Sequence, residues 1–78
     1  MNIKFLKLVF NRALRVKYSD PSKSETMLRF LLKELELMLN QSNTFYALKI
    51  NLELATCYSI LTITDRSQEC LDLAEKII

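Results

Sequence analysis

The 78-residue sequence contains no histidine, no glycine and no tryptophan, and it has only one proline. Without histidine, the chain lacks the commonest general base of enzymes and a common metal ligand. Without glycine, it cannot form the phosphate-binding loop or the dinucleotide-binding turn, because both need backbone conformations that only glycine permits. Tight β-turns usually need glycine as well. The sequence therefore predicts an all-α protein that is not an enzyme.

The reactive side chains that remain form no catalytic or metal-binding pattern. The two cysteines, Cys57 and Cys70, lie thirteen residues apart, which is not the spacing of a zinc or redox motif. Their spacing leaves a disulfide open, but we expect reduced, partly buried thiols, as is usual for free cysteines in a core. The carboxylates stand at ordinary helix-pairing distances from bases, as Glu25 does from Arg29. We expect no catalytic residue, no metal and no cofactor.

Nothing in the sequence directs the chain to a membrane or out of the cell. The basic opening "MNIKFLKLVFNRALRVK" lacks the uninterrupted apolar stretch and the small-residue cleavage site of a signal peptide. No segment approaches the roughly 20 consecutive apolar residues of a membrane span. We therefore expect a cytoplasmic protein.

The formal net charge of +2 hides an uneven distribution. Residues 1–17 carry five bases and no acid, whereas residues 18–78 carry six bases and nine acids. Lys4, Lys7 and Arg15 fall opposite the apolar side of the first expected helix, which makes them candidate anion-binding residues for nucleic acid or an anionic membrane surface. The reading that we favour is simpler: they form the solvated side of a helix docked on a mildly acidic body.

Apolar residues recur at helical spacing along almost the whole chain. They predict a single domain, residues 1–78, with four short helices that are joined by short loops and folded as antiparallel helical hairpins. Asp20 followed by Pro21 is typical of a helix start, because aspartate caps free amides and proline fits the first turn. The expected helices cover about residues 2–18, 22–40, 44–62 and 66–78.

The second and third expected helices are apolar on more than one side, which is unusual for a helix with a single neighbour. Half of all residues are apolar, yet a chain of this size buries only roughly 60 % of its unfolded surface. The surplus predicts either self-association or a surface for another protein. The candidate partner-binding residues lie on the second side of the third helix and at the end of the fourth: Phe45, Leu48, Leu52, Ala55, Ile77 and Ile78.

Part of this pattern resembles a tetratricopeptide repeat. Leu54, Ala55 and Tyr58 match the "L-small-x-x-Y" signature of its first helix. The spacing of its second helix is matched by Cys70, Ala74 and Ile77. The resemblance implies that the small residue lets the two helices of the C-terminal half approach closely, and that the tyrosine fills the space between neighbouring repeats. It covers about residues 51–78, and the chain departs from it at the turn, which lacks the usual glycine.

A short, glycine-free helical protein of this kind also resembles the small chaperones of bacterial type III secretion, among which the needle-subunit chaperones are nearest in size. In that family, a tetratricopeptide-like array holds the amphipathic C-terminal helix of the needle protein in an apolar groove. The resemblance implies a non-enzymatic chaperone or adaptor that captures an amphipathic helix of another protein, within a homo- or hetero-oligomer. The alternative is a small regulatory protein that binds nucleic acid through the basic side of its first helix.

Overall fold

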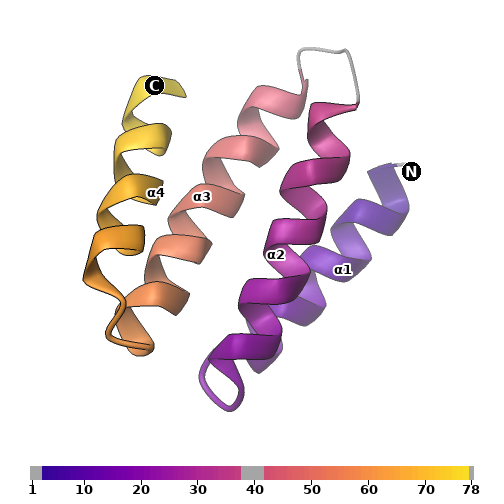
Figure 1. Cartoon of the computed structure of the whole chain (residues 1–78). Coiled ribbons are helices and arrows are strands. Elements are labelled where there is room, and N and C mark those ends of the chain that lie inside the picture. The colour runs from indigo at the N-terminus through magenta and orange to yellow at the C-terminus, as the bar shows by residue number, and fades with distance from the viewer. Residues whose placement is uncertain (1–2, 38–41, 78) are drawn as a thin grey trace.

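The computed structural model describes residues 3–37 and 42–77, and the side chains of residues 4–37 and 45–77. These residues form four α-helices and no strand, so the predicted all-α class is confirmed. Consecutive helices run antiparallel, as the sequence predicted (Figure 1). The helices are α1 (Ile3–Val16), α2 (Pro21–Glu36), α3 (Ser42–Ile60) and α4 (Thr64–Ile77).

Each helix packs mainly against its neighbour along the chain: α1 against α2, α2 against α3, and α3 against α4. In Figure 1, α1 and α4 lie on opposite sides of the molecule with α2 and α3 between them. The Cα atoms span 33 × 26 × 15 Å. Because a helix with its side chains is about 10–12 Å thick, the smallest of these dimensions allows at most two layers of helices. The fold is therefore an open array in which α3 has neighbours on two sides.

The turn between α1 and α2 contains the helix cap that the sequence predicted. A side-chain oxygen of Asp20 accepts a hydrogen bond from the amide of Lys23 (3.1 Å), and Pro21 is the first residue of α2. The prediction that the first helix reaches residue 18 was wrong, because α1 ends at Val16 and residues 17–19 form a turn. The prediction that the second helix continues to residue 40 was wrong at Leu37, which caps α2 after its last residue, Glu36; residues 38–40 lie outside the described residues.

The turn between α3 and α4 corrects the predicted ends of both helices. α3 ends at Ile60 rather than residue 62, and α4 begins at Thr64 rather than residue 66. Thr62 has a positive φ of 60°. The amide of Ile63 donates to the carbonyl of Tyr58 (2.8 Å), and the amide of Thr62 donates to the carbonyl of Ser59 (3.1 Å). This is the paired hydrogen-bonding pattern of a Schellman motif, with threonine where glycine is usual.

We expect Thr62→Gly to raise the free energy of unfolding by about 1 kcal/mol. A β-branched residue is strained in the left-handed region, and this gain exceeds the entropy that glycine adds to the unfolded chain. Chemical denaturation followed by circular dichroism measures the change. Ser59→Gly, one turn earlier in α3, is the matched control and should lower stability by about 1 kcal/mol. Equal destabilisation by both changes would show that Thr62 carries no strain.

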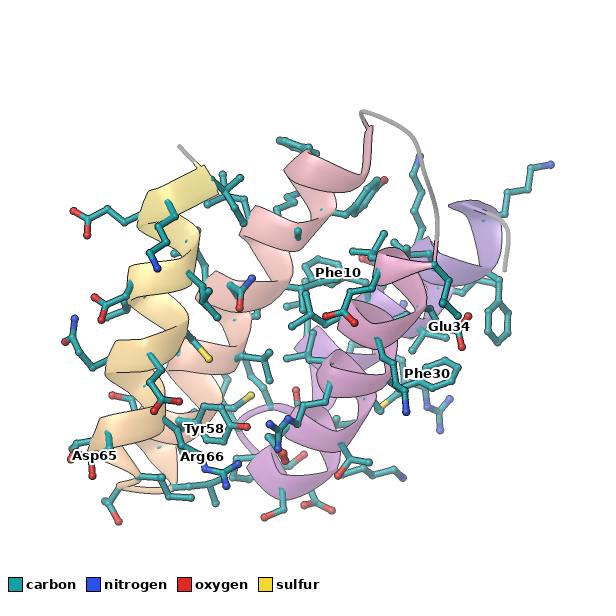
Figure 2. All side chains as sticks on the ribbon, turned by 45° about the horizontal axis from the view of Figure 1, so that its top comes forward. Phe10, Phe30, Glu34, Tyr58, Asp65 and Arg66 are labelled. Atoms are coloured by element: carbon teal, nitrogen blue, oxygen red, sulfur yellow. The ribbon has the colours of Figure 1, made fainter. Side chains whose placement is uncertain are left out.

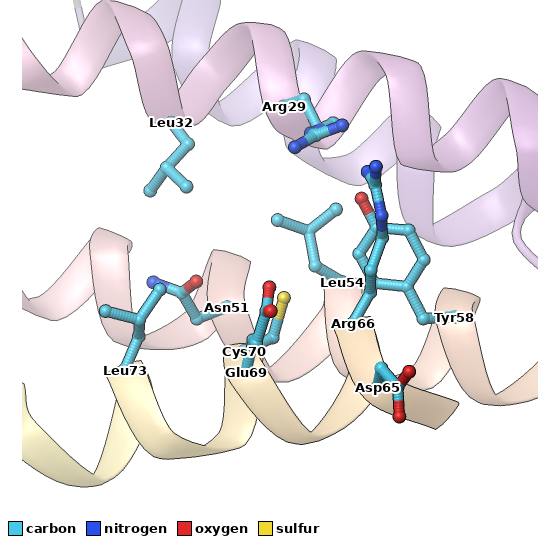
Figure 3. Close-up of a pocket in the computed structure, with 10 residues that line it drawn as sticks. All are labelled: Arg29, Leu32, Asn51, Leu54, Tyr58, Asp65, Arg66, Glu69, Cys70 and Leu73. Carbon is cyan, nitrogen blue, oxygen red and sulfur yellow. The ribbon is translucent and has the colours of Figure 1, made fainter. Parts of the chain in front are cut away.

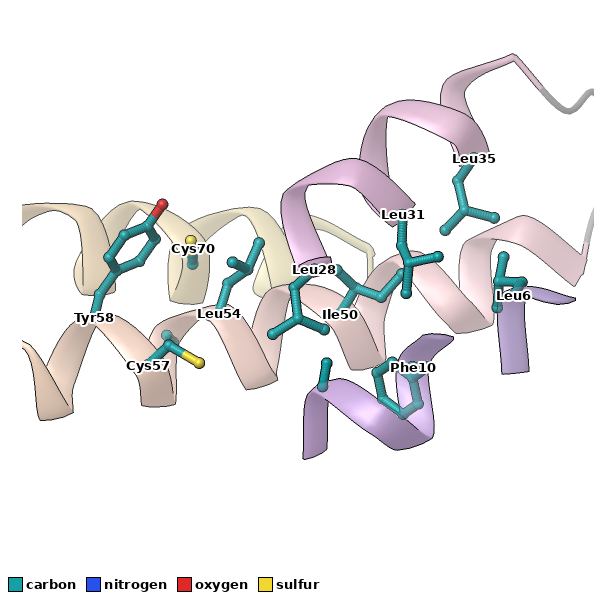
Figure 4. Packing of buried hydrophobic residues seen from close by; sticks show 12 residues of the cluster. Leu6, Phe10, Leu28, Leu31, Leu35, Ile50, Leu54, Cys57, Tyr58 and Cys70 are labelled. Atoms are coloured by element: carbon teal, nitrogen blue, oxygen red, sulfur yellow. The ribbon is translucent and has the colours of Figure 1, made fainter. Parts of the chain in front are cut away.

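The core is one cluster of apolar side chains to which all four helices contribute (Figure 4). One side of α3 supplies its centre, because Ile50, Leu54 and Cys57 are buried between the other helices. α1 and α2 cover this centre from one side, and α4 adds Cys70. Both cysteines are free thiols. The buried members of the cluster are Leu6, Phe10, Ala13, Leu28, Leu31, Leu35, Ile50, Leu54, Ala55, Cys57, Tyr58 and Cys70.

One buried serine joins three helices. Ser24, on α2, is fully buried and donates a hydrogen bond to the backbone carbonyl of Ala13 on α1 (2.7 Å). The thiol of Cys57 on α3 donates in turn to the Ser24 hydroxyl (3.4 Å). A buried hydroxyl without partners is destabilising, so these contacts fix how α1 and α3 sit against α2. No sequence pattern indicated this role, because Ser24 lies in the polar first turn of its helix.

Candidate functional site

Part of the second apolar side of α3 is exposed on the surface, whereas Ala55, predicted on the same side, is buried. Phe45 and Leu52 lie two turns apart, and their side chains are 58 % and 43 % exposed. Leu48, between them, is half-buried. Leu71 of α4 is 42 % exposed and lies with Leu52 along a shallow groove of about 420 Å³. We call Phe45, Leu48, Leu52 and Leu71 the outer apolar face.

Charged and polar contacts border the outer apolar face on its α1 side. The ammonium of Lys17 at the end of α1 forms an ion pair with Glu53 of α3 (2.7 Å). The ammonium of Lys49 lies 4.8 Å from the ring centroid of Phe45 and 5.9 Å from that of Phe10, close enough for cation–π attraction. A partner helix seated on the outer apolar face would therefore meet a charged border along one edge.

The other edge of the outer apolar face is the contact between α3 and α4. Ala55 is only 4 % exposed, and the hydroxyl of Ser67 on α4 donates to its carbonyl (2.9 Å). A small residue thus stands where the two helices approach closely. At the far end of α4, Ile77 is half-buried, and Ile78 lies outside the described residues.

The candidate anion-binding residues Lys4, Lys7 and Arg15 are all exposed on α1. Arg12 and Arg15 also line a shallow hollow of about 280 Å³ between α1 and α2, whose apolar wall includes Met27. Exposure fits both readings of this basic side, as a solvated surface and as a nucleic-acid contact.

A second groove, which the sequence did not reveal, lies over the opposite side of α3. α2 and α4 form its walls and α3 forms its floor, with a volume of about 450 Å³ (Figure 3). We call it the three-helix groove. It is lined by Arg29, Leu32, Asn51, Leu54, Tyr58, Asp65, Arg66, Glu69, Cys70 and Leu73. Asn51, a polar residue of α3 that lines this groove, lies between the apolar residues Ile50 and Leu52.

Burial changes the pKa values of two residues inside the three-helix groove. It raises the pKa of the Cys70 thiol and of the Tyr58 hydroxyl, and a hydrogen bond from Arg66 partly opposes the effect on Tyr58. Figure 2 shows Tyr58 and Arg66 lying together between α4 and α2. The guanidinium carbon of Arg66 is 6.0 Å from the centroid of the tyrosine ring. A thiol that ionises less readily than usual is a poor nucleophile.

We expect the protein to lose stability as the pH rises above about 9. The hydrogen bond to Glu53 raises the pKa of Lys17 above its ordinary 10.5, and burial raises those of Cys57 and Cys70 above 9.0 and that of Tyr58 above 10.0. In each case the folded state keeps a proton that the unfolded state releases. The resulting stabilisation is complete at pH 7 and declines as pH rises through these values.

Thermal unfolding at pH 7, 9 and 10.5 in a reducing buffer tests this dependence. The midpoint should be lowest at the highest pH, and Cys57→Ala should show a smaller fall than the natural chain. A midpoint that stays constant or rises would contradict it.

Comparison with known proteins found no relative: no family model, no curated protein and no solved structure matches the chain.

Two further findings concern the described residues alone. None of their helices combines the length and the hydropathy needed to cross a bilayer. Among the same residues, no three cysteine or carboxylate side chains gather closely enough to hold a metal ion.

Proposed function

We propose that this chain is a non-enzymatic protein-binding module that captures an amphipathic helix of a partner on the outer apolar face. The observation that carries the proposal is the exposure of Phe45, Leu52 and Leu71 on one side of a two-helix surface. Phe45, Leu48 and Leu52 recur at intervals of three and four residues, so their side chains form a ridge along α3. An amphipathic helix recognises such a surface with apolar anchors at matching intervals.

The borders of this face support a helix as the occupant. Lys49 and the ion pair between Glu53 and Lys17 stand along the α1 edge of the ridge and give that edge a charged, polar border. Apolar anchors with a mixed-charge border are typical of protein-protein interfaces, in which the rim is polar and the centre is dry. A nucleic-acid surface would instead need bases without acids, because phosphates repel carboxylates.

We further propose a chaperone or adaptor role, in the cytoplasm, with α3 and α4 acting as a tetratricopeptide-like pair. The support is the close approach of the two helices at Ala55 and the burial of Tyr58 beside α4. The resemblance to type III secretion chaperones suggests a secretion subunit as the partner. Shielding the partner's apolar helix would keep that subunit from assembling early.

The test is co-purification from the native source, followed by mass spectrometry and by titration of the captured protein's helix as a synthetic peptide. Calorimetry should show binding with a negative heat-capacity change, which is the mark of apolar surface being buried. Capture of a protein whose isolated helices do not bind would contradict the proposal.

Nucleic-acid binding through α1 is the second candidate, and the exposure of Lys4, Lys7 and Arg15 is what favours it. We expect Lys4→Gln, Lys7→Gln and Arg15→Gln together to leave the fold and partner capture unchanged. If α1 reads phosphates, the same triple change should abolish oligonucleotide binding and flatten its dependence on salt. Filter binding at several salt concentrations, beside a pull-down, separates the two functions. If the triple variant folded but no longer captured the partner, the partner-binding surface would lie on α1 instead of on α3 and α4.

A further inference from the structure

The floor of the three-helix groove contains a buried polar atom without a partner. Asn51 is 3 % exposed, and its side-chain NH2 donates to the carbonyl of Ala47 (2.9 Å). That contact fixes the orientation of the amide, because a carbonyl oxygen accepts only from a donor. The amide oxygen is left buried without a hydrogen bond among the described residues. Figure 3 shows the amide directed into the groove beside Leu73.

An unpaired buried acceptor destabilises the folded chain, so a function at this position is the simplest reason for its presence. Leucine would fill the same space without that penalty. A ligand that donates a hydrogen bond to Asn51 removes the penalty on binding. Leu73, which lies beside the amide in the groove, is 47 % exposed.

Two arginines converge at the other end of the groove. In Figure 3, the guanidinium groups of Arg29 from α2 and Arg66 from α4 both point toward the hydroxyl of Tyr58. The side chain of Arg29 is 56 % exposed, and its contact with Glu25, at 4.0 Å, is at the outer limit of an ion pair. Two like charges that face one another across a groove favour an anion between them.

The two ends are separated by a distance that suits a helix. Asn51 and Tyr58 are seven residues apart on α3, which corresponds to two turns, or about 10 Å along the axis. The apolar side chain of Leu54 lies between them, and those of Leu32 and Leu73 lie beside Asn51. A second helix laid along α3 would therefore present an acid to the arginines, an apolar residue one turn on, and a hydrogen-bond donor two turns on.

We propose that the three-helix groove binds a partner's helix that carries an acidic residue, an apolar residue and a side-chain hydrogen-bond donor on successive turns. With α2, α3 and α4, such a helix completes a four-helix bundle. This groove is separate from the outer apolar face, so the inference does not depend on the proposed function. Asp65 and Glu69 also line the groove. Their carboxylates repel anions, so the two arginines can hold a single carboxylate but not the continuous phosphates of a nucleic acid.

Two designed alanine-based peptides of about 20 residues, long enough to be helical in water, test the proposal. One carries glutamate, leucine and glutamine on successive turns, and the other carries lysine in place of the glutamate. Fluorescence anisotropy should show that the first binds at least about tenfold more tightly, since the lysine would face two arginines. Equal binding of both peptides, or stronger binding of an oligonucleotide, would overturn the proposal. A dimer in sedimentation that Arg29→Gln with Arg66→Gln dissociates would place a second copy of the chain in the groove and would also overturn the proposal.

Variants of the full chain locate the contact. Arg29→Gln with Arg66→Gln should weaken binding of the acidic peptide about tenfold or more. Lys23→Gln with Lys33→Gln is the matched control, because it removes the same charge from exposed positions of α2 outside the groove. The control should bind as the natural chain does. If both variants lost peptide binding equally, net charge alone would explain the effect, and a specific site in the three-helix groove would be contradicted.

Asn51→Leu gives an independent readout. It should raise the thermal midpoint of the free protein by about 4–8 °C and also weaken peptide binding. Both effects follow from removing the amide oxygen, which is unpaired in the free protein and accepts the peptide's hydrogen bond in the complex. Unchanged affinity with a raised midpoint would show that Asn51 is only a structural defect. Leu48→Asp with Leu52→Asp should leave this binding intact, so the outcome is independent of capture on the outer apolar face.

Discussion

Replacing Tyr58 with alanine is expected to lower the free energy of unfolding by about 3 kcal/mol. The side chain is 3 % exposed and lies between α3 and α4, where Arg66 covers its ring. Removing the ring leaves a cavity that the rigid backbones on either side cannot close. A domain of 78 residues has a total stability of about 4–12 kcal/mol, so the variant should be partly unfolded at moderate temperature.

Tyr58→Phe is the control for this experiment. It keeps the ring and removes only the hydroxyl that contacts Arg66, so we expect a loss of about 1 kcal/mol or less. Urea denaturation of both variants, followed by circular dichroism, separates packing from hydrogen bonding. Equal losses in the two variants would show that the hydroxyl, and not the volume of the ring, holds α4 in place.

The second large effect is expected on binding. Leu48→Asp with Leu52→Asp should abolish capture of the partner helix, with a loss of at least about 2–4 kcal/mol, because two carboxylates would be buried against apolar anchors. Leu52 is already exposed and Leu48 is half-buried, so the folded state should survive with higher solubility. A pull-down and a circular dichroism melt on the same preparation give both readouts.

Leu37→Asp with Tyr18→Asp is the matched control for the outer apolar face. Both side chains are exposed, and neither belongs to the outer apolar face: Leu37 follows the last residue of α2, and Tyr18 follows α1. This variant adds the same number of carboxylates and should keep its partner. Unfolding of the Leu48 and Leu52 variant would show that this side of α3 belongs to the core. Loss of binding in both variants would point to a general charge effect.

The positions of the four helices could be predicted because they depend on local patterns. Apolar residues at helical spacing and the Asp20–Pro21 cap can be recognised from residues that are close together in sequence. Helix ends were less accurate, since the pattern continues past the point where the backbone turns. Thr62 is the clearest case: threonine has no preference for the left-handed region, so nothing in the sequence marked the end of α3.

The outer apolar face and the three-helix groove differ in how far the sequence revealed them. Phe45, Leu48 and Leu52 stand on one helix, so their common side follows from helical spacing alone. Arg29 and Arg66 come from α2 and α4, and their meeting depends on how those helices lie across α3. Helix packing angles scatter too widely to be derived from one sequence. The Ser24 contacts to α1 and α3 were hidden for the same reason.

The order of packing in the array has a consequence for how the chain folds. Because α1 packs on α2, α2 on α3 and α3 on α4, most tertiary contacts join residues that are close in sequence. Chains with low contact order form their native pairings without closing long loops, and helical proteins of this kind fold within microseconds to milliseconds. Each hairpin can form as soon as its own two helices exist. Tertiary structure can therefore begin to form while the chain is still being synthesised, before α4 has emerged.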